Sequence, residues 1–308
     1  MARSCSQGNT TFKGIARTGG SSAVLGGANP GRCVAVFRIS ATLRAMLLCQ
    51  ISDPHIVPRG ALAYGRVDTG HMLQRCVRKI LALPRLPDAV VATGDLTDHG
   101  TAEEYEVLAE LLAPLPMPVY LVAGNHDDAN VLLGVFPQHP RPLQQDGFLQ
   151  YCVDDFGLRL VVLDTTVPGE PGGKLCAKRL QWLDRTLSES DRPTVIAQHH
   201  PPFVTGLSIM DQMSLADPDA EAAVVARHAH VQCVISGHFH RTIQARFAGT
   251  VASVCPSTAH QLTLDLIPGA DIRFTFEPSA FQLHLWNGQQ VVTHTTPVDD
   301  FPTWGSRG

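Results

Sequence analysis

The stretch that decides the fold is residues 47–55, Leu47-Leu48-Cys49-Gln50-Ile51-Ser52-Asp53-Pro54-His55. An apolar run ends here in a carboxylate and an imidazole that are two residues apart. Four further segments share this design: VVATGDLTD (90–98), VYLVAGNHD (119–127), VIAQHHPP (195–202) and VQCVISGHFH (231–240). Short β-rich runs that end in glycine and polar residues are typical of buried strands followed by tight turns. Because open α/β sheets bind ligands at the carboxyl ends of their strands, the five ends predict one metal site.

The composition of the whole chain narrows the class of protein. At 308 residues, with 44% hydrophobic and 17% charged residues, the chain fits one large α/β domain. The formal net charge of −4 gives no reason to expect a nucleic-acid polymer or a membrane as a partner. No apolar run in the sequence reaches the roughly 18 residues that a transmembrane helix needs. The eight cysteines form no CxxC pair, which predicts reduced thiols and a cytoplasmic location.

The first 45 residues differ from the rest of the chain. They contain six basic and no acidic residues, and they are rich in glycine and serine. An acid-free leader rich in arginine and serine is typical of an organelle transit peptide. We favour the alternative that Met46 is the natural start. Residues 1–45 are then a disordered or mis-assigned extension, and residues 46–308 form the folded domain.

Strand and helix signals alternate over most of the chain, which is typical of an α/β fold. Helical spacing predicts helices at 72–83, from a capping box at Thr101 and Glu104 onwards, at 177–187 and at 219–228. Residues 148–153 and 158–164 flank a turn and predict a hairpin. After residue 242 the helical signal vanishes, and alternating segments predict antiparallel strands at 242–247, 251–254, 261–266, 272–276 and 281–285. We therefore expect one domain with a β-rich C-terminal part.

The residue types at the five strand ends indicate a two-metal centre. Two cations about 3.5–4 Å apart can clamp the attacking and leaving oxygens of a displacement at phosphorus. Such a centre needs oxygen and imidazole ligands from several strands and one carboxylate that bridges, a role that we assign to Asp95. Imidazole, carboxylate and amide oxygen suit Mn, Fe, Co or Zn better than Ca. A single histidine elsewhere in the chain is more often a surface or core residue than a ligand.

The complete set of motifs carries a family resemblance. DPH at 53–55, GDLTD at 94–98, GNHD at 124–127, HHPP at 199–202 and GHFH at 237–240 together resemble the calcineurin-like metallophosphoesterases. Residues 94–128 and the segment YCVDDF at 151–156 look like the class III cyclic nucleotide phosphodiesterases and the related bacterial glycerophosphodiesterases. The resemblance covers roughly residues 46–260. It implies a four-layer α-β-β-α sandwich for the metallophosphoesterase domain.

The resemblance also implies a set of site residues. One metal would take Asp53, His55, Asp95 and His240, and the other would take Asp95, Asn125, His199 and His238. In the His199-His200 pair the family pattern favours the first residue as the ligand. His126 would lie beside the scissile phosphate and help the leaving oxygen depart, with Asp127 orienting its ring. A hydroxide bound to the two metals would be the nucleophile.

Three functions remain open at the level of sequence. The first is hydrolysis of 3',5'-cyclic nucleotides such as cyclic AMP, and the second is a glycerophosphodiesterase or broader phosphodiesterase activity on another small-molecule phosphodiester. The third is a non-catalytic binding module, which predicts lost ligands, whereas none is lost here. The roles of His200 and His260 stay open, as do the native metal pair and the oligomeric state. The β-rich C-terminal part offers a surface for a homo-oligomer.

Overall fold

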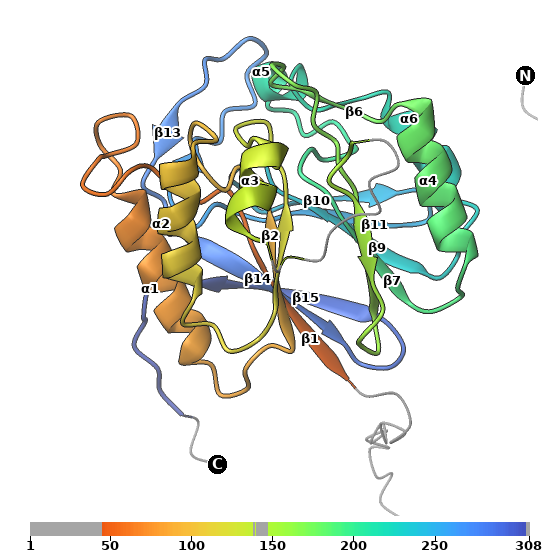
Figure 1. Ribbon diagram of the computed structural model, residues 1–308, viewed down its shortest axis with the longest axis horizontal. Helices are drawn as coiled ribbons and strands as arrows, with labels where there is room; N and C mark the ends of the chain where they lie inside the picture. Colours follow the sequence, from red (N-terminus) through yellow and green to blue (C-terminus); the bar gives the residue numbers. More distant parts are fainter. Residues whose placement is uncertain (1–44, 138, 140–146, 306–308) are drawn as a thin grey trace, which may run out of the picture. The chain divides into compact units, whose positions relative to one another are not determined.

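The computed structural model describes residues 45–137, 139 and 147–305. The extension predicted for residues 1–45 lies, apart from its last residue, outside this part of the chain. The described chain contains two large sheets (Figure 1). The first has the order β15 (Val291–Pro297), β14 (Ala280–Trp286), β1 (Met46–Ile51), β2 (Ala89–Thr93) and β3 (Val119–Val122). The second has the order β10 (Ile243–Phe247), β11 (Thr250–Val254), β9 (Val231–Ser236), β7 (Thr194–Ala197), β5 (Arg159–Val162) and β4 (Tyr151–Val153).

Helices cover the outer face of each sheet. Figure 1 shows α1 (Thr69–Leu81), α2 (Ala102–Leu112) and α3 (Ala129–Val135) on one side of the strands, with α4 (Ala177–Ser188) and α6 (Pro218–Val225) on the other. Short elements complete the described chain: α5 (Ser208–Asp211), the pair β6 (Gly173–Lys174) and β8 (Leu215–Ala216), and the pair β12 (Gln261–Leu262) and β13 (Phe274–Thr275). The layers therefore follow the order of an α-β-β-α sandwich, as predicted.

The alternating side chains of β1 explain why the strands lie between two layers. Met46 and Leu48 pack with side chains of the second sheet. Cys49 and Ile51 point the other way and pack with the apolar faces of α1 and α2. A third apolar cluster joins the second sheet to α4 and α6. Because successive side chains of a strand point to opposite faces, a strand with apolar side chains on both faces has to be covered on both sides.

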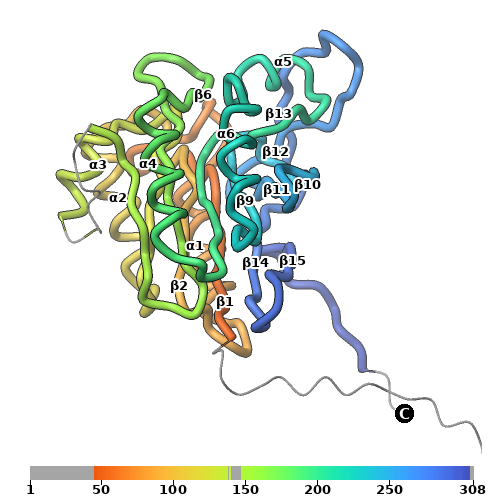
Figure 2. The backbone as a smooth tube through the Cα atoms, turned by 90° about the vertical axis from the view of Figure 1, so that its right-hand side faces the viewer, coloured from red at the N-terminus to blue at the C-terminus, as the bar shows by residue number. Residues whose placement is uncertain are grey.

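Most of the predicted helices and strands begin and end within a few residues of those in the structure. The capping box at Thr101 and Glu104 starts α2, and the predicted hairpin is β4 and β5. Two predictions about the C-terminal part were wrong. β11 pairs parallel to β9, and the strands expected at 261–266 and 272–276 form only the short pair β12–β13. Figure 2 shows β14 and β15 near β1, because β14 pairs antiparallel with β1 and extends the first sheet.

In the described part of the chain, no helix combines the length and the apolar character needed to cross a membrane.

Candidate metal centre

The seven predicted metal ligands all follow strands of the two sheets. The first sheet supplies Asp53 and His55 after β1, Asp95 after β2 and Asn125 after β3, and the second supplies His199 after β7 and His238 and His240 after β9. The three strands of the first set pair in parallel, and so do the two strands of the second, so the carboxyl ends of each set lie at one edge of their sheet. The site is therefore built from both sheets rather than from the edge of one.

Glycine allows the ends of the two sheets to meet. A Cβ atom on Gly237, which follows β9, would lie 2.6 Å from Asp53 Oδ2 and 2.8 Å from the carbonyl oxygen of Thr93, and it would overlap Ser52 Oγ. The backbone nitrogen of His238 then donates to Asp53 Oδ1 at 2.9 Å. A side chain at residue 237 would push β9 away from β1 and open the site.

The first group of ligands surrounds a small space. The ligand atoms of Asp53, His55, Asp95 and His240 all lie within 4.8 Å of one another, and all four residues are buried. His55 Nε2 lies 3.6 Å from Asp95 Oδ2 and 3.1 Å from His240 Nε2. His240 Nε2 lies 3.5 Å from Asp53 Oδ1. This is the set of four that the resemblance assigned to one metal.

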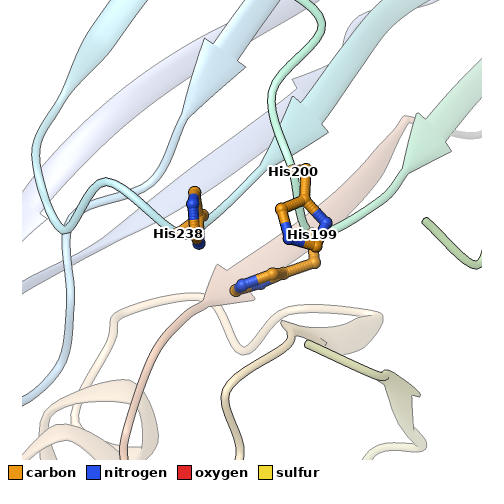
Figure 3. A group of neighbouring side chains, drawn as sticks. All are labelled: His199, His200 and His238. Atoms are coloured by element: carbon orange, nitrogen blue, oxygen red, sulfur yellow. The ribbon is translucent and has the colours of Figure 1, made fainter. Parts of the chain in front are cut away.

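The second group shares Asp95 with the first. His199 Nε2 lies 3.4 Å from Asp95 Oδ1 and 3.1 Å from Asn125 Oδ1. The ring centroids of His199 and His238 are 5.0 Å apart, and Figure 3 shows the two rings facing the same region. Since Asp95 Oδ2 faces the first group and Oδ1 faces the second, this carboxylate is placed to bridge two cations.

The tautomers of three imidazoles are set for metal binding. His199 Nδ1 lies 2.8 Å from the carbonyl oxygen of Thr93, and His240 Nδ1 lies 3.0 Å from that of His260. His55 Nδ1 lies 3.0 Å from Asp98 Oδ1. A carbonyl or carboxylate oxygen accepts a hydrogen bond, so each Nδ1 carries a proton and each Nε2 is the ring nitrogen left to face the ligand cluster. Oxygen partners on the remote ring nitrogen are the usual support of metal-binding histidines.

Buried atoms without partners also fit a cation. Asp53 Oδ2 and His238 Nε2 are buried, and neither forms a hydrogen bond with the described residues. Within residues 45–137, 139 and 147–305, the ion-pair partners of Asp53 and Asp95 are imidazoles rather than lysine or arginine. Two buried carboxylates close together are costly unless positive charge is supplied. The donor set therefore fits two divalent cations.

The pKa values of the histidines in the metal-free protein agree with a metal-binding role. Burial lowers the pKa of His238 to about 3 and that of His240 well below its ordinary value, so both rings are neutral and able to ligate. Burial also opposes protonation of His199, but the Asp95 carboxylate outweighs it and raises the pKa of His199 to about 9. A proton shared between His199 and Asp95 thus competes with a cation for the same position.

The backbone is strained at the site. Five of the seven predicted ligands have positive φ angles, namely Asp53 (49°), His55 (44°), Asp95 (46°), His238 (71°) and His240 (48°). This left-handed region costs a non-glycine residue roughly 1–2 kcal/mol. Strain that is concentrated in this way is typical of functional sites, where the surrounding structure imposes the geometry.

His126 lies at the open side of the ligands, but the predicted role of Asp127 was wrong. His126 Nδ1 bonds to the carbonyl oxygen of Asp98 at 2.8 Å, so the loop after β2 orients this ring. The Asp127 carboxylate instead accepts from the backbone nitrogens of Leu96, Thr97 and Gly124 and from the hydroxyls of Thr97 and Tyr105, at 2.8–3.2 Å. With five donors already bound, Asp127 fixes the loops that carry Asp95 and Asn125.

Asp98 is a site residue that sequence reasoning missed. Its carboxylate supports His55, and its carbonyl supports His126. Asp98 is the last residue of the GDLTD motif. The motif from which Asp95 was predicted as a ligand therefore also contained Asp98. Its partners lie 43 and 28 positions away in sequence, which is why the pairing could not be read from the chain alone.

The hydrogen bonds of His200, whose role the sequence left open, show which segment its ring contacts. Its Nε2 bonds to the carbonyl oxygen of Pro171 at 3.2 Å and therefore carries the proton, while its Nδ1 accepts from Thr165 Oγ1 at 2.8 Å. Both ring nitrogens have partners on the 165–171 segment, which His200 therefore holds in place. A ring nitrogen of His200 also lies within 4.8 Å of ring nitrogens of His199 and His238, and Figure 3 shows the three rings together. His260 is buried and packs against His240 and His55, with ring centroids 4.8 and 5.5 Å apart.

Comparison with known proteins identifies the family. The family model described as calcineurin-like phosphoesterase matches residues 46–242. The chain belongs to this family. It is 34% identical over 259 residues to a probable glycerophosphodiester phosphodiesterase of Arcobacter nitrofigilis, covering 83% of this chain and 94% of the relative. It is 36% identical over 250 residues to a probable cyclic nucleotide phosphodiesterase of Rhodopseudomonas palustris, covering 79% and 89%.

Solved structures of the calcineurin-like fold match the same architecture. A dimetal phosphatase from Danio rerio is similar with a TM-score of 0.58 and 17% identity, covering 82% of this chain and 99% of that chain. At 17% sequence identity, this structural similarity supports a shared fold and says nothing about function. Family membership makes the chain a hydrolase of the metallophosphoesterase class, whose members use divalent metals.

Proposed function

We propose that the protein hydrolyses small phosphodiesters at a dinuclear metal centre, and that 3',5'-cyclic nucleotides are its substrates. The observation that carries the proposal is the convergence of seven side chains from two sheets around Asp95, whose two oxygens face two separate groups of donors. Phosphodiester hydrolysis uses such a pair of cations to activate water and to offset the charge of the phosphate.

The distances between the donors support two proposed metal sites. Asp53, His55, Asp95 and His240 hold one cation, and Asp95, Asn125, His199 and His238 hold the other. The donor set of imidazoles, carboxylates and one amide favours Mn, Fe, Co or Zn. Because Asp95 serves both sites, we expect its loss to remove both cations together.

His126 is the proposed proton donor to the leaving group. It lines the same pocket as His55, Asp95 and Asn125. Its Nδ1 proton is held by the carbonyl oxygen of Asp98, which leaves Nε2 facing the substrate. In the protonated ring, Nε2–H gives its proton to the departing oxygen when the P–O bond breaks, and the ring ends neutral with its Nδ1 proton still in place.

The relatives support two kinds of substrate. The relative from Rhodopseudomonas palustris is described as a probable cyclic nucleotide phosphodiesterase, and others are described as cyclic AMP phosphodiesterases. The relative from Arcobacter nitrofigilis, described as a probable glycerophosphodiester phosphodiesterase, is the observation that favours glycerophosphodiesters as the second candidate. The cytoplasmic location and the homo-oligomer expected from the sequence stay predictions.

The test compares the two substrates and removes the bridging residue. Purified protein supplied with Mn²⁺ is assayed on cyclic AMP and on glycerophosphoethanolamine, and a turnover of cyclic AMP far below that of the glycerol ester would reject the first substrate. In the Asp95→Ala variant we expect activity and both metal ions to be lost together, as measured by elemental analysis. Asp184→Ala is the matched control, because Asp184 pairs with Arg227 and His228 at the surface. Retention of two metals by Asp95→Ala would contradict the bridging role.

A further inference from the structure

Part of the pocket beside the candidate metal centre is apolar and does not contribute ligands. The pocket holds about 500 Å³ of space that no protein atom fills, part of it open to solvent. The metal-ligand side chains line one part of it, and the other part is lined by Tyr64, Met210, Met213, Leu262, Ile272 and Phe274. A phosphate group at the metals would therefore leave an apolar space next to it for the rest of the substrate.

Two aromatic rings form the accessible surface of this apolar part. The rings of Tyr64 and Phe274 are stacked, with centroids 5.0 Å apart and an angle of 23° between their planes. Both residues are about half exposed, at 49% and 48%. Tyr64 comes from the loop after β1 and Phe274 from β13, so two segments far apart in the sequence meet here. Other exposed aromatic side chains, such as Phe276 and Trp304, do not line this pocket.

His260 connects the aromatic pair to the metal ligands. Its ring packs edge-to-face against Tyr64 and Phe274, with centroids 5.3 and 4.8 Å away. The same ring lies 4.8 Å from the ring of His240. Phe274 is thus separated from the candidate metal ligand His240 by a single ring. The aromatic pair therefore lies next to the candidate ligand His240 and lines the same pocket.

The backbone holds Tyr64 in an unfavourable conformation. Its φ angle is 52°, which is in the left-handed region. The turn is closed by hydrogen bonds from the backbone nitrogen of Gly65 to the carbonyl oxygen of Leu62 and from Ala63 to Val67, at 3.0 and 2.9 Å. Glycine or asparagine would occupy such a position at lower cost. A bulky aromatic residue kept there is consistent with a role of its side chain in binding.

We propose that the Tyr64–Phe274 pair is the surface on which the nucleobase of a cyclic nucleotide stacks, which makes these residues determinants of substrate specificity. The inference rests on the proposed function, since it assigns one part of the same substrate. Stacking on an aromatic ring suits a planar base, whereas the glycerol and ethanolamine parts of a glycerophosphodiester offer no planar group. The aromatic pair therefore distinguishes the two candidate substrates.

The first experiment measures how the ring at residue 274 affects each substrate. Phe274→Leu keeps an apolar side chain and removes the aromatic face. With Mn²⁺ supplied, we expect KM for cyclic AMP to rise about tenfold, which corresponds to about 1.4 kcal/mol of base stacking, with kcat changed less than about twofold. KM and kcat for glycerophosphoethanolamine should not change. Phe276→Leu, an exposed position outside the pocket, is the matched control and should resemble the wild type.

A binding measurement makes the inference independent of turnover. Adenosine 5'-monophosphate and inorganic phosphate are titrated into wild-type protein and Phe274→Leu by calorimetry. We expect the affinity for the nucleotide to fall about tenfold in the variant and the affinity for phosphate to stay the same. Equal losses for both probes, or no loss for the nucleotide, would overturn the inference. If the wild type hydrolyses neither diester, the proposed function fails, and this comparison still decides whether the pair binds a base.

Discussion

Replacing Asp127 with asparagine tests the structural account of the site most directly. The carboxylate accepts five hydrogen bonds, three at Oδ1 and two at Oδ2. An amide nitrogen cannot accept, so Asp127→Asn loses at least two of these bonds whichever way its side chain is turned. Bonds to a charged acceptor contribute about 1.5–3 kcal/mol each, which gives a loss of about 3–6 kcal/mol.

A second effect reduces this magnitude. Burial and the nearby Asp95 carboxylate raise the pKa of Asp127, which shows that the charged form is costly to hold in this place. A neutral amide is less costly to bury. We therefore expect a net loss near the lower end of the range, about 3 kcal/mol of the free energy of unfolding.

The assay is urea unfolding of the metal-free protein at pH 7, so that changes in metal affinity do not enter the measured free energy. Asp128→Asn is the matched control. Asp128 is the N-cap of α3, where its side chain accepts from the backbone nitrogens of Asn130 and Val131, and asparagine caps helices as well as aspartate does. A loss below about 1 kcal/mol in Asp127→Asn, or equal losses in the two variants, would refute the reasoning.

Three further predictions concern catalysis, packing and pH. His126→Ala should keep both metals in elemental analysis and lose roughly 10²–10⁴-fold in kcat, the usual contribution of an acid–base group; loss of the metals would contradict its assignment. Gly237→Ala should lower the urea midpoint clearly, because its Cβ meets Asp53, whereas Gly134→Ala, with open space around it, should not. Burial raises the pKa of Glu221 from 4.5 to about 8, so its contribution to stability is complete below about pH 4.5 and is lost as the pH rises towards 8. Glu221→Gln should therefore flatten the decline of unfolding free energy between pH 5 and 8, and identical pH profiles would contradict this.

The sequence predicted the strands and the ligands because both depend on local patterns. The apolar run before Asp53 alternates between two cores, and its abrupt end marks the turn that presents the side chain. The helix α3 was not predicted, because its seven residues bury little beyond Leu132 and contain Gly134. The strand β15 was missed for a similar reason, since four of its seven residues are polar and none of the seven is buried.

Contacts between distant segments could not be predicted in the same way. The family resemblance implied that Asp127 orients the ring of His126, the proposed acid. In the structure the turn points the carboxylate at the loop after β2, and the ring is held by Asp98. The stacking of Tyr64 on Phe274 joins segments from the two ends of the domain. Such pairs depend on how the two sheets are placed against each other, which no local pattern encodes.

The left-handed backbone at Asp53, His55, Asp95, His238 and His240 has a consequence for engineering. At each of these positions glycine would relax the chain, so a selection for heat resistance alone would favour variants that have lost the proposed metal ligands. Thermostability and hydrolysis are thus opposed at these five residues. Attempts to make the enzyme more robust should leave them fixed and change the helices on the outer faces instead.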